Sequence, residues 1–344
     1  MKPILTAAVA ILALVAPLAS VAELQSNEIP TNIPGTTTIA APPQGFDPLT
    51  ASDADLASYG FPPRPDQQSS PKVYTSWAKA MEASKTRLMP NLEQTNIFHG
   101  PAKLGKATEG SAKKNGTATS YNWSGYMQFT GASSYGSSSV YYIVADSVVP
   151  VARQAFGVAN CTWDYASTWA GIDGWGSNDV LQAGYEYDAY ACGSTTATYY
   201  SPWYEWYPYG EVRITNLPAA PGDDFFIEVW HTSATQGYAY LVNRNTGQYV
   251  EVGFTAPSGY SLIGNVGEWI VERPGVGGGL ATFTNYIDEV VWDAYAYTFN
   301  SALLYPGSSA AYAITGLDNS GNPDSYPTLL GTYAFLMQDE GSAY

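Results

Sequence analysis

The chain has 344 residues, with 14 lysines and arginines, 30 acidic residues and two cysteines. After Tyr121 the imbalance is stronger, because that region contains four arginines, no lysine and 21 acidic residues. Nucleic acids and anionic membranes need positive surface charge, so neither partner is expected. The 33 glycines and 28 tyrosines, without long helix-forming runs, favour an all-β protein. The acidic excess is consistent with activity at low pH. It is equally consistent with a surface charge that only keeps the protein soluble.

Residues 1–22 have the pattern of a secretory signal peptide. Lys2 supplies the positive end, residues 4–18 are apolar, and Ser20-Val21-Ala22 is a small-residue cleavage pattern. The apolar run is short for a bilayer span, and no later segment is apolar for long enough. We therefore expect a secreted, extracellular protein that is cleaved near Ala22.

Residues 23–120 are expected to form a pro-segment. The part up to about Ser70 is rich in Pro, Thr and Ala with little periodicity, which predicts an extended or disordered chain. A helix is then predicted over residues 76–89, capped by Ser76 and ended by Pro90.

This predicted pro-segment is basic where the following domain is acidic. Residues 72–114 contain eight basic side chains and three acidic ones. We expect opposite charge to hold the segment on the domain as an intramolecular inhibitor near neutral pH, and acid to loosen it. The alternative is a plain linker. The processed chain would begin between Lys113 and Tyr121.

Residues 121–344 are expected to form a β-sandwich or barrel. Short alternating stretches are separated there by Gly, Ser, Asn and Pro clusters, which is typical of many short strands. Strands are predicted over residues 140–149, 225–231, 238–242, 268–272 and 287–297. The run Gly-Val-Gly-Gly-Gly at residues 275–279 predicts a flexible loop.

The two cysteines, Cys161 and Cys192, both lie in this domain. In an exported protein we expect them to form a disulfide, which contributes roughly 3 kcal/mol in the chain-entropy model. Two free buried thiols are the alternative.

Several catalytic chemistries lack their residues here. The domain has one histidine, His231, and no Gly-x-Ser-x-Gly turn, so a serine triad is disfavoured and His231 is expected to be structural or exposed. The several His or Cys ligands that zinc needs are missing from the sequence. Asp173, Asn178 and Asp179 are near enough for calcium, but they lack EF-hand spacing and are more typical of a turn. We expect no metal and no cofactor.

Carboxylates, amides and aromatic rings remain, and they are dense in residues 168–209. Because side chains alternate along a strand, Gln182 would share a face with Glu186, and Glu205 with Tyr207. A carboxylate among large rings is desolvated, which raises its pKa and makes it a candidate acid or base.

Two classes of function use such residues: a hydrolase working through carboxylates, and a sugar-binding sandwich with aromatic platforms. A glycosidase would need two carboxylates facing each other across a sugar. The sequence offers several candidates without choosing among them: Asp173, Glu186, Glu205, Glu268 and Glu272.

Five motifs follow one another between about Asn122 and Trp292. They are Asn122-Trp123-Ser124-Gly125, Trp169-Ala170-Gly171-Ile172-Asp173-Gly174, Leu181-Gln182-Ala183-Gly184, Trp203-Tyr204-Glu205-Trp206-Tyr207-Pro208 and Glu268-Trp269-Ile270-Val271-Glu272. In this order they resemble the eqolisins, or glutamic peptidases. Each motif alone would be weak, but together they are specific.

The resemblance implies a concanavalin-like sandwich of two curved antiparallel sheets, whose concave face holds a peptide. It implies a catalytic pair at Gln182 and Glu272, with Asp173 hydrogen-bonding and orienting the glutamine. The other residues that it assigns to the cleft are Glu205, Trp123, Trp169 and Tyr207.

In that chemistry, ionised Glu272 takes a proton from the water that attacks the peptide carbonyl, and the Gln182 amide donates to the developing oxyanion. Glu272 then passes its proton to the departing amine. An unperturbed Glu titrates near ~4.3, so an acidic optimum follows. The resemblance implies a monomeric, pepstatin-insensitive endopeptidase whose partners are peptide or protein substrates and its own pro-segment.

The chain departs from the family pattern after the catalytic Glu. Arg273 and Pro274 stand where the family has an acidic and then an aromatic residue, and a guanidinium next to Glu272 is expected to lower its pKa. The rival interpretation is a non-catalytic or glycan-binding, lectin-like sandwich in which the aromatic residues form a sugar platform.

Overall fold

The computed structural model describes residues 27–104, 116–155 and 161–341. The predicted signal peptide at residues 1–22 lies outside these ranges, as do the first residues of the region where processing was predicted. None of the helices within them has the length and apolar character needed to cross a bilayer.

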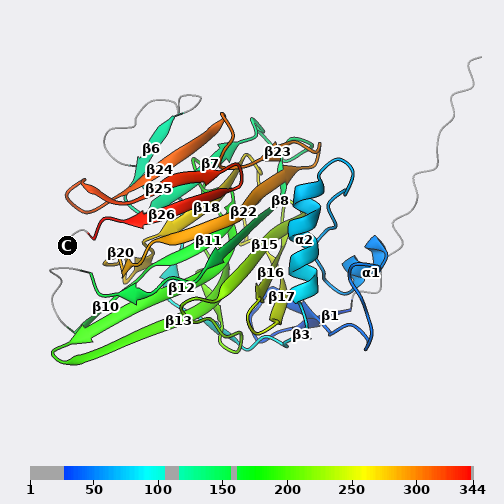
Figure 1. The fold of residues 1–344 in the computed structure, drawn as a ribbon, viewed down its shortest axis with the longest axis horizontal. Helices are drawn as coiled ribbons and strands as arrows, with labels where there is room; N and C mark the ends of the chain where they lie inside the picture. Colours follow the sequence, from blue (N-terminus) through cyan, green and yellow to red (C-terminus); the bar gives the residue numbers. More distant parts are fainter. Residues whose placement is uncertain (1–26, 105–115, 156–160, 342–344) are drawn as a thin grey trace, which may run out of the picture.

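Within these ranges, 21 strands form one hydrogen-bonded network that is folded into two layers (Figure 1). The first layer consists, in spatial order, of β4 (Leu92–Gln94), β14 (Val212–Ile214), β13 (Thr195–Trp206), β12 (Leu181–Cys192), β11 (Ser167–Ile172), β18 (Val266–Glu272), β7 (Trp123–Phe129) and β24 (Ala311–Leu317). At its margins lie β6 (Thr117–Ser120), parallel to β24, and β10 (Thr162–Asp164), antiparallel to β12.

The second layer consists of β17 (Gln248–Thr255), β16 (Gln236–Asn243), β15 (Asp224–Ser233), β8 (Val140–Val148), β22 (Glu289–Thr298) and β26 (Ala334–Asp339). Strand β25 (Pro323–Gly331) pairs with β26 and β24 and so connects the two layers. Short strands extend this layer: β1 (Glu28–Pro30), β2 (Thr36–Ile39), β3 (Thr86–Arg87) and β23 (Leu303–Leu304).

The remaining elements are small. Two minor sheets contain β5 (Ile97–Phe98), β19 (Gly275–Val276) and β20 (Gly279–Leu280), and β9 (Ala152–Arg153) with β21 (Asn285–Tyr286). The helices are α1 (Asp53–Ser58) and α2 (Pro71–Ala83).

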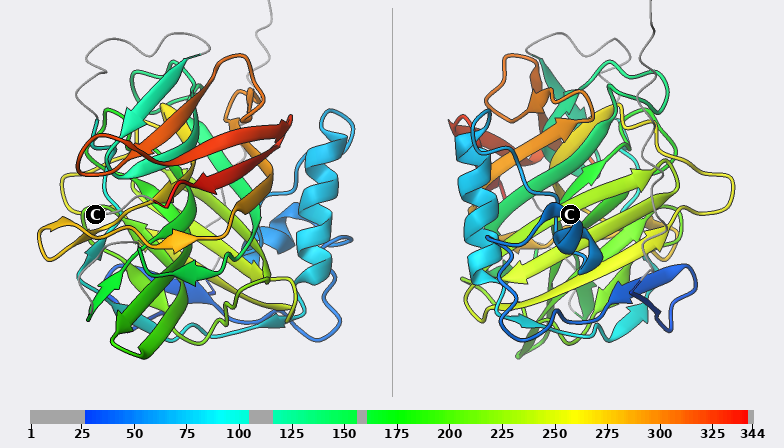
Figure 2. Two further views of the ribbon diagram at one scale, coloured as in Figure 1. Left: turned by 60° about the vertical axis from the view of Figure 1, so that its left-hand side comes forward. Right: turned by 90° about the vertical axis from the view of Figure 1, so that its right-hand side faces the viewer.

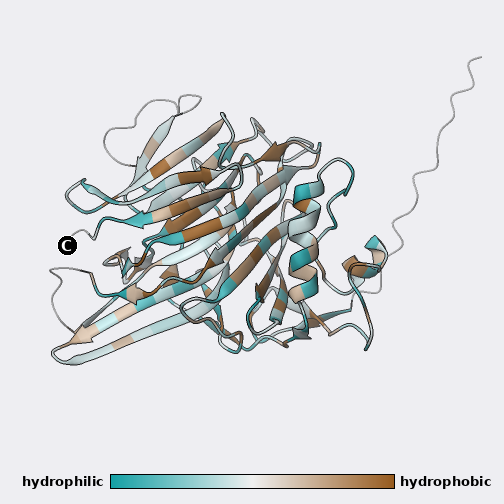
Figure 3. Ribbon diagram, in the orientation of Figure 1, coloured by the Kyte–Doolittle hydropathy of each residue, from teal (hydrophilic) through white to brown (hydrophobic). Residues whose placement is uncertain are grey.

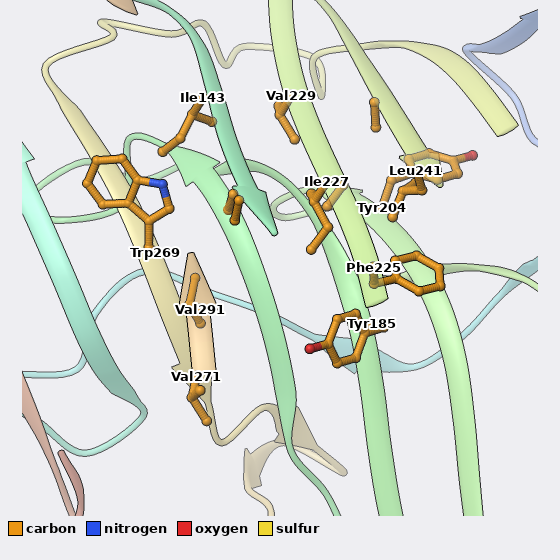
Figure 4. Close-up of a cluster of buried hydrophobic side chains, with 14 of the residues drawn as sticks. Ile143, Tyr185, Tyr204, Phe225, Ile227, Val229, Leu241, Trp269, Val271 and Val291 are labelled. Atoms are coloured by element: carbon orange, nitrogen blue, oxygen red, sulfur yellow. The ribbon is translucent and has the colours of Figure 1, made fainter. Parts of the chain in front are cut away.

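The main core fills the space between the two layers (Figure 4). Alternate residues of β15, including Phe225, Ile227 and Val229, point toward the first layer, whose Tyr185 and Trp269 point back. All of these side chains are buried. In Figure 3 hydrophobic residues are interspersed with hydrophilic ones along strands of both layers. One face of the first layer is therefore used for packing, and its opposite face is available for chemistry.

Helix α2 packs on the outer face of the second layer (Figure 2). Its buried residues Val73, Trp77, Ala80 and Met81 follow the helical spacing and meet the aromatic rings of that sheet. Proline at the first helical position, Pro71, suits a helix start because its missing N–H would have no partner there.

The helix predicted at residues 76–89 is therefore real, but its boundaries were wrong. It begins five residues earlier, so Ser76 is a buried interior residue rather than a cap. It ends at Ala83, well before Pro90, because the backbone leaves the helix to pair with β17: the N–H groups of Lys85 and Thr86 donate to the carbonyl of Gly247. Tertiary pairing outweighs the local stop signal here.

The prediction of an extended or disordered chain before Ser70 was also wrong for its described part, which starts at residue 27. Strands β1 and β2 add to the edge of β17, and α1 follows. Phe46 and Phe61 stack on each other, and Phe61 packs against Tyr240 of β16. Isolated aromatic residues in a Pro-rich stretch have no periodicity, so their common packing site is not visible in the sequence.

The predicted strands and the predicted disulfide are confirmed, whereas one predicted loop was wrong. All five predicted strands are present with shifted ends, and Cys161 and Cys192 form the disulfide. The exception is the loop predicted at residues 275–279, which instead contains the small hairpin β19–β20 that pairs with β5.

The packing of α2 yields a stability prediction. Replacing Trp77, which is fully buried, by Ala removes the largest side chain of the helix–sheet contact and is expected to lower the free energy of unfolding by about 3–5 kcal/mol. Lys72→Ala, on the exposed side of the same helix, should change it by less than about 0.5 kcal/mol. Denaturant unfolding of both full-length variants measures this. Equal stability of the two variants would show that α2 is not bound to the sheet.

Candidate active site

The candidate site lies on the face of the first layer that points away from the main core. Strand β11 pairs with β12 on one side and β18 on the other. In this register Gly171 lies between Gln182 and Glu268, while Ser167 pairs with both Glu186 and Glu272. Because side chains alternate, the motifs of three strands bring their polar residues to one surface.

A glycine makes room for the central ring of this surface. A Cβ atom on Gly184 would lie 2.0 Å from the Thr168 carbonyl oxygen and 2.7 Å from the Cβ of Trp169. Neither contact is tolerable, so only glycine lets β12 pass beneath Trp169. The indole is fully buried and meets Trp123 edge-on, with ring centroids 5.0 Å apart.

Trp169 holds the carboxyl group of Glu272. Its Nε1–H donates to Glu272 Oε2 at 2.9 Å, and the Asn122 side-chain amide donates to Oε1 at 3.2 Å. Burial raises the pKa of Glu272 above its ordinary value, while His99, Asn122 and Trp169 act in the opposite direction. The carboxyl group is thus fixed by donors and protonates more readily than a surface glutamate.

Gln182 donates a hydrogen bond to the chain's own backbone. Its Nε2 donates to the carbonyl oxygen of His99, a residue of the predicted pro-segment. On the other side of that residue, the N–H of His99 donates to Glu205 Oε2 at 2.9 Å. Residues 97–103, which we call the cleft segment, therefore lie across the candidate site.

The imidazole of His99 is fully buried in this site. It stacks on Trp203 with ring centroids 3.8 Å apart and planes inclined by 4°. Its Nε2 is 2.8 Å from Glu211 Oε2, and its Nδ1 is 3.1 Å from Ser167 Oγ and 3.5 Å from Glu272 Oε2. Burial alone would lower the pKa of His99, but the hydrogen bonds and charges of Glu211 and Glu272 raise it to about 10.

 Past His99, the cleft segment is bound by the side chains of Asn122 and Trp123, from the first of the five motifs. Trp123 Nε1 donates to the carbonyl of Gly100 at 3.1 Å, and Asn122 Nδ2 lies 3.3 Å from the same oxygen. A Cβ atom on Gly100 would lie 3.0 Å from the ring of Tyr207. The cleft segment is thus held mainly through its backbone, as a peptide ligand would be.

A second group of carboxyls surrounds Glu211. Arg213 lies 3.0 Å from Glu211 Oε1 and 2.5 Å from Glu186 Oε1. Burial, followed by the charge of Glu211, raises the pKa of Glu186 to about 8, and burial also raises the pKa of Glu205 well above its ordinary range. The site therefore contains more buried carboxyl groups than cations that can pair with them.

Two predicted roles are corrected by the structure. Asp173 does not orient Gln182: its carboxylate accepts the backbone N–H groups of Ile263, Gly264 and Asn265 at 2.7–2.9 Å. Its backbone φ of 68° turns the chain at the end of β11 and aims the side chain at that loop.

Arg273 is the second correction, because its guanidinium donates hydrogen bonds away from the neighbouring Glu272. Consecutive strand residues point to opposite faces, and the guanidinium donates to the Ala281 carbonyl and to Asn319 Oδ1 at 2.9 Å. The largest influences on the pKa of Glu272 are burial, His99, Asn122 and Trp169.

His231 has the structural role that the sequence analysis expected. It is buried, with Nε2 2.5 Å from the Val140 carbonyl and Nδ1 3.2 Å from the Tyr135 hydroxyl, and burial lowers its pKa to about 4. Asp179 accepts from Trp206 Nε1 at 3.2 Å. Among the described residues, no three His, Cys, Asp or Glu side chains are grouped to hold a metal ion.

Sequence reasoning missed several residues of the site. These are His99, Asn122, Ser167, Trp203 and Glu211. Asn122 and Trp203 stand inside the quoted motifs, so their positions were a usable signal. No such signal pointed to His99, because it lies in the predicted pro-segment, which was expected to bind the domain through its overall positive charge.

Comparison with known proteins gives consistent matches. A model of the Peptidase A4 family matches residues 121–324, more than half of the chain. Aspergillopepsin-2 of Aspergillus niger is 34% identical over 122 residues, which cover 35% of this chain and 42% of that protein. Scytalidopepsin B of Scytalidium lignicola is 36% identical over 107 residues, covering 31% of this chain and 38% of that protein. Each matched stretch therefore spans less than half of the relative.

A structural comparison supports the fold. The crystal structure of scytalido-glutamic peptidase with a transition state analog inhibitor has a TM-score of 0.52 and 22% identity to this chain, covering 64% of this chain and 98% of that one. At this identity the likeness bears on the fold alone, and it confirms the predicted β-rich architecture of antiparallel sheets.

The corrected role of Asp173 can be measured. Asp173→Ala removes the acceptor of three backbone N–H groups and is expected to lower the free energy of unfolding by several kcal/mol, since a hydrogen bond to a charged group contributes about 1.5–3 kcal/mol. Asp173→Asn, which tolerates the positive φ, should lose less. Hydrogen exchange should accelerate at residues 263–265. Unchanged exchange there would contradict the anchoring role.

Proposed function

Because the chain belongs to the Peptidase A4 family, the eqolisins, we propose that it is a glutamic endopeptidase that cleaves peptide bonds by means of Gln182 and Glu272. The observation that carries this proposal is the position of the chain's own peptide. The side-chain amide of Gln182 donates to the carbonyl of His99, and the Glu272 carboxyl lies beside the same residue.

In the proposed reaction a substrate carbonyl takes the place of the His99 carbonyl. Ionised Glu272 removes a proton from water, whose oxygen bonds to the carbonyl carbon, and the Gln182 N–H stabilises the oxyanion. When the C–N bond breaks, Glu272 returns the proton to the amine nitrogen. One water is consumed, giving one carboxyl and one amine, and the catalyst ends in its starting state.

The surroundings of Glu272 suit a base at acidic pH. A raised pKa lies closer to a mildly acidic working pH. A general base is most efficient when its pKa is close to the working pH. Below its pKa Glu272 is protonated and cannot accept the proton of water. We therefore expect activity to fall on the acid side as Glu272 becomes neutral.

We also propose that residues 23–120 are a pro-segment of a secreted zymogen and inhibit the enzyme by occupying its cleft. The cleft segment lies over the dyad and carries ion pairs from His99 to Glu211 and Glu272. Among the basic residues of the segment, Arg87 stacks on Phe61 and Tyr249. Inhibition is thus proposed to be local and substrate-like.

The rival, a glycan-binding sandwich, has weaker support. A sugar platform uses exposed aromatic faces. Here the N–H groups of Trp169 and Trp123 are directed at the Glu272 carboxyl and at a backbone carbonyl, and both rings are buried. These contacts favour a peptide ligand.

The dyad is tested by substitution. We expect Glu272→Gln to lower kcat on an unfolded protein substrate by about 10²–10⁴-fold and Gln182→Ala by about 10²–10³-fold, because one loses the base and the other the oxyanion donor. Activity is measured from pH 2 to 7 with pepstatin present. Asp288→Asn, an exposed carboxyl of the same domain, is the matched control and should keep full activity.

Two checks make the result decisive. Each variant is also incubated with a trace of wild-type protein, so that failure to process its own segment is not mistaken for loss of catalysis. Circular dichroism confirms folding. If folded and processed Glu272→Gln retains wild-type activity, the dyad assignment is wrong, and the aromatic face should be screened against glycans.

A further inference from the structure

The cleft segment is placed as a substrate would be, which identifies the subsites beside the dyad. Its backbone is bound residue by residue: the Glu211 N–H donates to the Ile97 carbonyl at 2.9 Å, Glu205 accepts the His99 N–H, and Gln182 donates to the His99 carbonyl. If Gln182 is the oxyanion donor, the carbonyl that it holds is the one that is attacked. His99 then occupies the position just before the scissile bond, and Gly100 the position just after it.

The pocket around the His99 side chain matches a protonated imidazole on three sides. Trp203 covers its face at 3.8 Å. One ring nitrogen faces Glu211 Oε2 at 2.8 Å, and the other faces Ser167 Oγ and Glu272 Oε2 at 3.1 and 3.5 Å. Both carboxylates are acceptors, so an imidazole with a proton on each nitrogen satisfies them best.

Part of the pocket is built by residues of the sandwich. Arg213 holds the other oxygen of Glu211 at 3.0 Å and is itself tied to Glu186. Glu211 is therefore directed into the pocket by residues of the sandwich. When the cleft segment leaves, Glu211 Oε2 loses the imidazole that lies 2.8 Å from it and faces the vacated space.

Other side chains fit this pocket less well. Phe would keep the stacking on Trp203 but leave Oε2 of Glu211 without its partner, which is costly for a buried carboxylate. Lys would supply charge without a planar ring, and Gln would supply neither full charge nor an aromatic face. On the other side of the bond, the ring of Tyr207 lies 3.0 Å from a Cβ placed on Gly100, which favours a small residue there.

We propose that this pocket, formed by Trp203, Glu211 and Ser167 with Glu272 at its edge, is a subsite that selects histidine immediately before the scissile bond. The inference rests on the proposed peptidase function. Hydrolysis would break the bond between the histidine carbonyl carbon and the next nitrogen. Water supplies the hydroxyl of the new carboxyl group and the proton of the new amine. Within the chain itself, the selected bond is His99–Gly100.

A peptide series tests the subsite. The acid-incubated full-length protein is assayed, at the pH of its highest activity on an unfolded protein, with a peptide of residues 94–103 and its His99→Gln, His99→Phe and His99→Lys versions. We expect kcat/KM for the His peptide to exceed each of the others by about tenfold or more, with cleavage between the residues at positions 99 and 100 by mass spectrometry.

A variant connects the preference to the pocket. Glu211→Gln should bring the ratio of kcat/KM for the His peptide over the Gln peptide close to one, while Asp288→Asn should leave the ratio unchanged. Because a ratio is measured, a general loss of activity does not affect the result. The wild-type series alone decides the matter if Glu211→Gln does not fold.

The outcomes separate this inference from the proposed function. Hydrolysis of the unfolded protein without a preference for histidine, or cleavage at another bond of the peptide, overturns the subsite and leaves the peptidase intact. Hydrolysis of neither protein nor peptide overturns the proposed function and the subsite with it.

Discussion

The burial of carboxyl groups on one face of the first layer determines much of this structure. Glu186, Glu205, Glu211 and Glu272 are all nearly or fully buried there. An isolated buried carboxylate is costly, so each must be neutralised, paired or hydrogen-bonded. Arg213, provided by the sandwich, serves two of them. His99, which belongs to the preceding segment, contacts the remaining carboxyl groups. The segment therefore supplies partners that the buried carboxyl groups of the site need.

This arrangement explains why the segment before the sandwich is part of the fold. Its helix α2 covers the aromatic outer face of the second layer, and residues 97–103 cross the opposite side of the molecule, over the first layer. Burial of apolar surface secures the first contact, and hydrogen bonds to the backbone secure the second. Removing the cleft segment would expose the same donors and acceptors that a substrate peptide requires.

The strand pattern and the motifs allowed the sandwich, the disulfide and the shared face of Gln182 and Glu186 to be predicted, because two-residue alternation is a local property of a strand. The direction of Arg273 follows from the same alternation and was overlooked. The partner of Asp173 could not be predicted, since the loop at residues 263–265 approaches it only through tertiary pairing. His99 stayed hidden for a similar reason: its site is assembled from four strands.

His99 is expected to be buried as a cation in this site, and the chain contains only two histidines, so its charge state can be measured. Proton NMR of the histidine rings in the full-length protein, titrated from about pH 5.5 to 9, measures it directly. Because the pKa of His99 is raised to about 10 and that of His231 is lowered to about 4, neither ring should titrate in this range. One resonance should stay that of an imidazolium and the other that of a neutral ring. A histidine titrating near its ordinary pKa of about 6.5 would contradict this expectation, because His99 would then not be held as a cation by Glu211 and Glu272.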